Sequence, residues 1–144
     1  HAGVIALVPL TAEQAQRIVA GDLTGLEHAA GWPHADTADG VGLVERGASA
    51  WLVELDGVVI GDCGTTGPLG PEVEVGFGLA AEFRGRGHGT ELVRALAAAL
   101  LEKPGVSSVV AHTLPENTAS RRVLEKAGFE HDGAHDELAR YVLR

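Results

Sequence analysis

Apolar and polar positions alternate most regularly along residues 73–79. Apolar residues occupy every odd position from 73 to 79, and Glu72, Glu74, Gly76 and Gly78 occupy the even ones. A period of two is typical of a strand with one buried face, so residues 73–79 are predicted to be a β-strand. Glycine weakens a strand interior. The two glycines therefore indicate either a bulge or a group, such as a ligand, that lies close against the backbone.

Helical spacing follows this strand. Leucines and a valine recur with helical periodicity through residues 87–101, and Pro104 and Gly105 end the predicted helix. The apolar run at residues 106–112 is then a second strand. Strand, helix and strand in this order form a crossover unit, in which the two strands lie parallel.

Shorter signals place the other elements. A capping-box pattern at Thr11 and Gln14 predicts a helix that runs to about residue 20. Asp56 and Gly57 favour a tight hairpin. The further predicted elements are a helix at residues 118–127 and strands at residues 4–8, 51–55, 58–63, 129–134 and 138–143. The signals in residues 22–47 are mixed, and they predict a loop at 31–34 and a short helix around Leu43.

Length and composition indicate one globular domain. The chain has 144 residues, of which 45% are apolar and 22% charged, and it contains no repeat and no Pro/Ser-rich linker. The apolar stretch at residues 92–101 is too short for a membrane span and is interrupted by Arg94. Cys63 has no second cysteine to pair with, and there is no secretory signal pattern. We therefore expect a soluble protein of the reducing cytoplasm.

Net charge narrows the set of partners. The formal charge is -9, which repels nucleic-acid phosphates and favours cationic partners. An anionic cofactor would need a local site of backbone N–H groups and arginines. No histidine spacing is typical of a metal site, so no metal is predicted.

Such a local site occurs between the strand at 73–79 and the helix at 87–101. Three glycines alternate there with Arg84, Arg86 and His88. The first N–H groups of a helix lack internal partners and the helix dipole favours negative charge, so a pyrophosphate can dock at this turn. Neither the Walker A spacing nor the dinucleotide-binding spacing is present.

The spacing Arg84-x-x-Gly87-x-Gly89 resembles the acetyl-CoA-binding signature of the GNAT superfamily of N-acyltransferases. A second segment at residues 124–129 reads Leu-Glu-Lys-Ala-Gly-Phe. It is similar to a run in the branch that includes the bacterial ribosomal-protein N-terminal acetyltransferases. The resemblance is close over residues 73–129 and elsewhere concerns only the order of elements.

The resemblance implies a fold, a cofactor and a set of contacts. The fold is a single GNAT-like domain over residues 1–144, of mixed α/β (α+β) class, with a partly splayed central sheet flanked by helices. The cosubstrate is acetyl-CoA. Asn117 and Ser120, which share one helical face, match cofactor-contacting positions, and Arg121 or Arg122 would meet a phosphate. Main-chain groups of Phe77, Gly78 and Leu79 would hold the pantetheine arm, and Arg84, Gly85, Arg86, Gly87, His88, Gly89 and Thr90 would hold the pyrophosphate.

The implied reaction is direct attack of an amine on the thioester. Glu74 is the candidate general base, because an amine with a pKa of about 8 to 10 must lose a proton before it attacks. Glu72 and His112 stay open as alternatives. The family often has a tyrosine where this chain has Leu124, so Ser120 or water would protonate the leaving thiolate.

Several alternatives stay open at this point. A non-catalytic acyl-CoA-binding sensor of the same fold is the alternative function. The acceptor is a small-molecule amine, such as a polyamine or an aminoglycoside, or a peptide N-terminus, and the protein is a monomer or a homodimer. Trp32, Pro33 and His34 either shape an acceptor pocket or form a hydrophobic plug. Cys63 is interpreted as a small buried hydrophobic residue.

Overall fold

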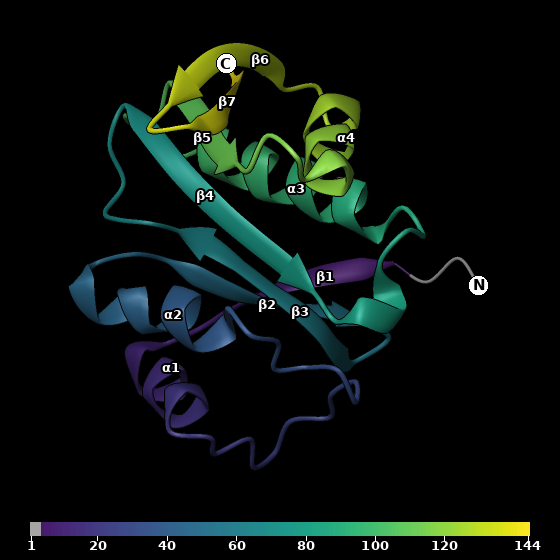
Figure 1. Cartoon of the computed structure of the whole chain (residues 1–144). Coiled ribbons are helices and arrows are strands. Elements are labelled where there is room, and N and C mark those ends of the chain that lie inside the picture. The colour runs from purple at the N-terminus through teal and green to yellow at the C-terminus, as the bar shows by residue number, and fades with distance from the viewer. Residues whose placement is uncertain (1–3) are drawn as a thin grey trace.

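The computed structural model describes residues 4–144 and contains one seven-stranded sheet with helices on both faces (Figure 1). The elements in chain order are β1 (Ile5–Pro9), α1 (Ala12–Val19), α2 (Thr37–Gly42), the 3-10 helix η1 (Leu43–Arg46), β2 (Ala50–Leu55), β3 (Val58–Thr65), β4 (Glu72–Leu79), the 3-10 helix η2 (Ala81–Phe83), α3 (His88–Leu101), β5 (Ser108–Thr113), α4 (Thr118–Lys126), β6 (Glu130–His135) and β7 (Leu138–Leu143). The mixed α/β architecture predicted from the sequence is confirmed.

The sheet is divided at its centre by the separation of two strands. Its order is β1-β2-β3-β4-β5-β7-β6, and every neighbouring pair is antiparallel except β4 and β5. This parallel pair is short, because it includes only residues 72–74 of β4, and Glu74 faces Val110 at its end. Beyond Glu74 the two strands diverge within the described chain, while β4 continues to pair with β3 as far as Leu79. The splayed sheet is therefore confirmed, and Glu74 marks the point of divergence.

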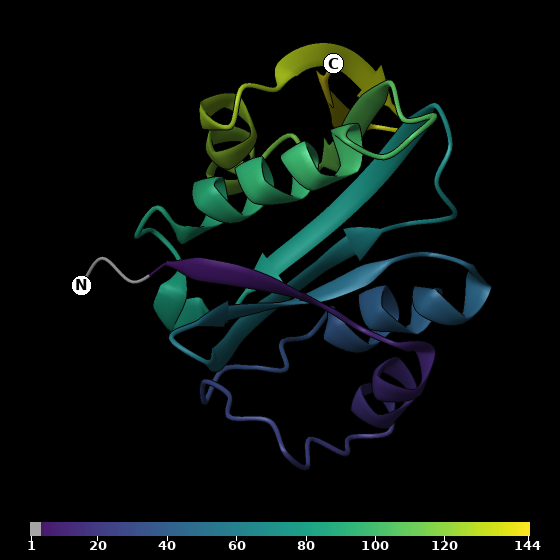
Figure 2. The same cartoon turned by 180° about the vertical axis from the view of Figure 1, so that it is seen from behind.

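Helices cover the two faces of the sheet unequally. Figure 1 shows α2, with α1 beside it, in front of the sheet, and Figure 2, which is seen from behind, shows α3 on the opposite face. The buried stripe of α3 consists of Leu92, Val93, Leu96, Ala97 and Leu100. The apolar face of β4 is buried as the alternation predicts, with Val73 2% and Val75 5% exposed. The even positions of β4, including Glu74, therefore belong to the α2 face.

Local turn and cap chemistry behaves as the sequence indicates. The Thr11 side chain accepts from the N–H of Gln14, and the Gln14 side chain accepts from the N–H of Thr11, which completes the capping box of α1. Asp56 and Gly57 have φ values of 51° and 81°, the left-handed pair that a tight two-residue hairpin requires. These elements depend on neighbouring residues only, so they could be predicted from the sequence.

The bounds of one strand and one helix could be given more closely from the structure than from the sequence. The strand expected from residue 106 begins at Ser108, because the N–H of Val106 still bonds to the carbonyl of Lys103 in the turn after α3. The helix expected around Leu43 begins earlier, at Thr37, and Leu43 opens its 3-10 continuation. The side chain of Thr37 is buried against β3, and this tertiary contact fixes the start of α2.

The α3 helix and every other helix of the described chain are too short or too polar to cross a lipid bilayer.

Candidate active site

The Gly-rich turn before α3 is open at the end of the helix. Gly85 and Gly87 have φ values of 74° and 87°, and Gly87 is the N-cap residue of α3. Within the described residues, no side chain caps this helix end. Arg84 donates from Nε to the carbonyl of Leu79 at 3.1 Å, which ties the turn to the end of β4. The first amides of α3, which the sequence predicts to bind an anion, are therefore not occupied by a capping side chain of the described residues.

Gly89 has a packing role in addition. A Cβ atom at this position would lie 3.2 Å from Cγ2 of Val123, so the glycine allows α4 to approach α3 closely. Arg86 lies over the ring of Phe83, 5.8 Å from its centroid, at the solvent-exposed turn.

Gly76 and Gly78 lie on the same face of β4. A side chain covers this face at Gly78 but not at Gly76. A Cβ atom at Gly78 would lie 2.6 Å from Nε2 of His34, whereas a Cβ atom at Gly76 meets no described atom within 4 Å. The sequence indicated a bulge or a close group such as a ligand. At Gly78 the close group is His34, from a loop 44 positions away in the chain, and at Gly76 the face is open.

Glu74 and His112, which the sequence offered as alternative bases, form a pair. Nδ1 of His112 lies 2.7 Å from Oε2 of Glu74, and the hydroxyl of Thr66 donates to Oε1 of Glu74 at 3.0 Å. Because the carboxylate accepts, Nδ1 carries the proton in the neutral imidazole and Nε2 holds the lone pair. Nε2 is buried and has no hydrogen bond with any described residue. The Glu74 side chain is 42% exposed, against 11% for His112.

Glu72, the third candidate base, is engaged elsewhere. Its Oε1 accepts from Arg140 at 2.7 Å, and Arg140 also contacts Asp132 on β6. The carboxylates of Glu72 and Asp132 raise the pKa of the Arg140 guanidinium, with the hydrogen bond to Glu72 as the main cause. Glu72 is therefore part of an ion-pair cluster on β4, β6 and β7.

The predicted contacts on α4 lie together at its first turn. Asn117 is the N-cap residue, and its Oδ1 accepts from the N–H of Ser120 at 3.1 Å. Arg121 bonds to the hydroxyl of Tyr141 and to a main-chain carbonyl. Arg122 is exposed and its side chain makes no hydrogen bond with the described residues, so it is the freer of the two arginines. Leu124 is 1% exposed and belongs to the core.

An acidic cavity lies between α2 and the strands β3 and β4. Its volume is about 420 Å³, and its lining includes His34, Asp36, Asp39, Asp62 and Thr66 but no lysine or arginine. Gly76 and Phe77 line it from β4, next to the point where β4 and β5 separate. This position and charge suit a cationic group.

The loop at residues 31–34 contributes one buried side chain and one side chain that lines the cavity. Trp32 is 1% exposed and donates from Nε1 to Asp62 at 2.9 Å, so it is a buried plug. His34 lines the cavity. Sequence analysis missed Asp62, although a carboxylate within the apolar run at 58–63 is the kind of signal that could have revealed it. It also missed Thr66 and the two exposed aspartates, because their positions depend on tertiary structure.

Cys63 is expected to be unreactive in the folded protein. It is 4% exposed, and burial, with a smaller contribution from the Asp62 charge, raises the pKa of its thiol. We expect Ellman's reagent to leave the native protein unlabelled and to titrate the full thiol after unfolding in guanidinium. Rapid labelling of the native protein would show that β3 is accessible.

No cluster of three or more histidine, cysteine or acidic side chains suited to a metal ion occurs among residues 4–144.

The fold and the site define a class of protein. A mixed sheet that divides beyond a parallel pair, with an open Gly-rich helix end beside the division, is the arrangement that the GNAT resemblance implied. The model of the acetyltransferase (GNAT) domain family matches residues 5–130, so the chain belongs to this family.

Similar proteins include antibiotic-modifying and ribosomal-protein-modifying enzymes. A kanamycin resistance protein of Rhizobium radiobacter is 45% identical over 49 residues, which are 34% of this chain and 45% of that protein. The match thus spans less than half of the relative. The structure of aminoglycoside acetyltransferase AAC(6')-Ib with coenzyme A and kanamycin has a TM-score of 0.70 at 23% identity, covering 96% of this chain and 94% of that one. A ribosomal L7/L12 alpha-N-protein acetyltransferase with coenzyme A has a TM-score of 0.70 at 17% identity, covering 99% and 94%. At these identities the structural likeness concerns the fold.

Proposed function

We propose that the protein transfers the acetyl group of acetyl-CoA to a primary amine of a small polycationic acceptor, of the aminoglycoside type. The observation that carries the proposal is the position of the Glu74 and His112 pair, at the point where β4 and β5 separate and beside an acidic cavity. Family membership supplies the acetyltransferase class.

The described residues suit acetyl-CoA. The open amides at the start of α3 and the guanidinium groups of Arg84 and Arg86 suit its phosphates. The edge of β4 that lies beyond its pairing with β5 offers main-chain groups at Phe77, Gly78 and Leu79 for the pantetheine arm. When bound, acetyl-CoA supplies a thioester carbonyl as the electrophile.

Glu74 acts as the general base in this proposal. Its side chain is the more exposed member of the pair, and its partner Thr66 lines the cavity, so an amine at the edge of the cavity reaches Glu74 before the buried Nε2 of His112. Thr66 and His112 hold its two oxygens in place. His112 is therefore a positioning residue, which also stabilises the carboxylate as it accepts the proton.

Ser120 is the candidate donor on the leaving side. Leu124 is buried, so no hydroxyl comes from the position where the family often has tyrosine. Ser120 is partly exposed at the start of α4, and its main-chain N–H is held by Asn117. A thiolate with a pKa of about 8.5 leaves readily, and Ser120 or water delivers its proton.

The acceptor class follows from charge and from similarity. The cavity carries three aspartates and no basic side chain. Two of the similar proteins are a kanamycin resistance protein and an aminoglycoside acetyltransferase. The run at residues 124–129 resembles the ribosomal-protein N-terminal acetyltransferases, so a peptide N-terminus is the competing acceptor.

An amine panel tests the proposal. With acetyl-CoA, kanamycin is expected to give a kcat/KM about tenfold or more above that of a peptide with a free N-terminus, because the acidic cavity favours several positive charges. Thiol release measures turnover, and the buried Cys63 does not contribute to it. Preference for the peptide would assign the protein to the ribosomal-protein branch. Tight CoA binding without turnover of any amine would instead indicate an acyl-CoA sensor.

A further inference from the structure

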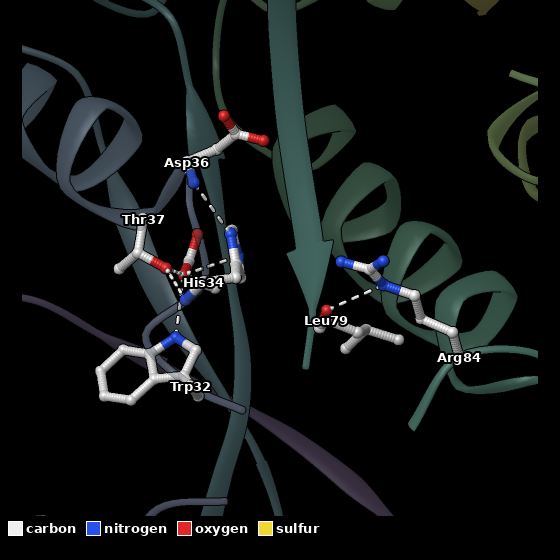
Figure 3. A network of polar contacts seen from close by, with 7 residues as sticks. Trp32, His34, Asp36, Thr37, Leu79 and Arg84 are labelled. Atoms are coloured by element: carbon white, nitrogen blue, oxygen red, sulfur yellow. Dashed lines mark hydrogen bonds and ion pairs between the residues drawn. The ribbon is translucent and has the colours of Figure 1, made fainter. Parts of the chain in front are cut away.

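Asp62 is a buried carboxylate that the catalytic proposal does not use. It lies in β3 and is 6% exposed. One of its oxygens, Oδ2, accepts hydrogen bonds from Nε1 of Trp32 at 2.9 Å and from the hydroxyl of Thr37 at 2.7 Å. Figure 3 shows Trp32, Thr37 and His34 directed toward this one point. These hydrogen bonds and the approach of His34 all involve Oδ2, none within the described residues involves the other oxygen, Oδ1, and Asp62 lines the acidic cavity.

His34 is an incomplete partner for this carboxylate. Its Nε2 lies 3.2 Å from Oδ2 of Asp62, yet it is buried and makes no hydrogen bond of good geometry with the described residues. Nδ1 accepts from the N–H of Asp36 at 3.2 Å, which is the geometry of a neutral imidazole. Protonation of Nδ1 would break that hydrogen bond. The buried charge of Asp62 is thus only partly compensated by the protein.

The surroundings of the pair favour a cation. Asp36 and Asp39 add negative charge from the loop and from α2, while Arg84 is the cation that acts on His34 from the turn before α3. From β4, Gly78 presents only its backbone. A cavity here meets a buried carboxylate with an unused oxygen and an imidazole nitrogen without a hydrogen bond. Buried polar groups normally have partners, so this combination indicates a ligand site.

The register of β3 and β4 fixes how far Asp62 and His34 lie from Glu74. Asp62 faces Gly78 across β3 and β4, and Gly78 lies four residues beyond Glu74 on the same face. At about 3.3 Å per residue, the separation along the strand is roughly 13 Å. Gly76 lies between them and leaves the face open.

We propose that Asp62, with His34 as a displaceable partner, is a second ammonium subsite that selects acceptors with a remote positive charge in addition to the amine that reacts at Glu74. The inference rests on the proposed function and specifies its acceptor. An entering ammonium group contacts Oδ1 of Asp62 and displaces the imidazole, with no covalent change.

A series of diamines tests the subsite. The KM of wild-type protein is expected to fall from diaminobutane to diaminodecane, because only the long members span from Glu74 to Asp62. Asp62→Asn is expected to raise the KM of the long diamine by about tenfold or more with little change in kcat, and to leave the KM of a monoamine unchanged. Asp39→Asn is the matched control, since it removes the same charge from an exposed site of the same cavity, and a change below about threefold is expected.

A second pair of variants keeps the test decisive if Asp62→Asn fails to fold. His34→Gln removes the imidazole next to Asp62 and leaves the carboxylate in place, so it should change the KM of long diamines but not of monoamines. His131→Gln removes a histidine on β6, outside the cavity lining, as a control. Equal effects on monoamines and diamines, or equal effects of Asp39→Asn and Asp62→Asn, would overturn the subsite. If no amine is acetylated, the proposed function fails, and calorimetric binding of the same diamines to wild type and variants still decides the inference.

The subsite also predicts a pH dependence. The Asp62 carboxylate, 3.2 Å from Nε2, is the main cause that raises the pKa of His34 above its ordinary value of 6.5. Below that raised pKa the imidazolium neutralises Asp62 and competes with the ammonium group, and above it the carboxylate charge is available. The KM of the long diamine should therefore rise as the pH falls from about 8 to about 6. His34→Gln should flatten this rise, and an unchanged profile in that variant would contradict the competition.

Discussion

Glu74→Gln is expected to lower kcat by about 10² to 10⁴-fold with little change in the KM for acetyl-CoA. The amide keeps the size of the side chain but cannot accept a proton, and general base catalysis is worth about this much. The variant should fold, because Glu74 is partly exposed and lies at the end of the β4 and β5 pairing. Steady-state kinetics with a saturating amine measure the effect.

Glu72→Gln is the matched control for this variant. It makes the same change on the same strand face, two residues earlier, at a carboxylate bound to Arg140. Its kcat is expected to stay within about threefold of wild type. His112→Gln should lose about tenfold, and the double variant Glu74→Gln/His112→Gln should be no slower than Glu74→Gln alone, because the two residues act as a unit. A larger loss in Glu72→Gln than in Glu74→Gln would show that the base is wrongly assigned.

Gly87→Val is expected to raise the KM for acetyl-CoA by about 10²-fold. Gly87 has a φ of 87°, a left-handed conformation that costs an L-residue about 1–2 kcal/mol and a β-branched residue more. The strained turn would rotate the first amides of α3 away from the phosphates, and hydrogen bonds to charged groups are worth about 1.5–3 kcal/mol. Calorimetric titration with CoA measures the loss directly.

Gly105→Val controls for backbone strain alone. Gly105 has a φ of 84° in the turn after α3, and a Cβ atom there meets no described atom within 4 Å. Both variants should lower the thermal midpoint by a few degrees, but only Gly87→Val should weaken CoA binding. Equal affinities of Gly87→Val and wild type would remove the turn from the cofactor site.

The elements that carry the candidate site could be predicted from the sequence, but the contacts between their side chains could not. The strand with Glu74, the turn at Gly87 and the first turn of α4 each follow from local pattern, and each occurs where it was expected. The sequence left Glu74 and His112 as rival bases. They are partners, because a short parallel register brings side chains 38 positions apart to 2.7 Å.

The sequence by itself determined the order of strands and helices, the hairpin at Asp56 and the open Gly-rich start of α3, because each depends on a few adjacent residues and their backbone preferences. Only the tertiary structure decided where β4 separates from β5 and that His34 fills the face of Gly78 beside Asp62. Those contacts arise from strand register and from the packing of a distant loop, which no local pattern of residues specifies.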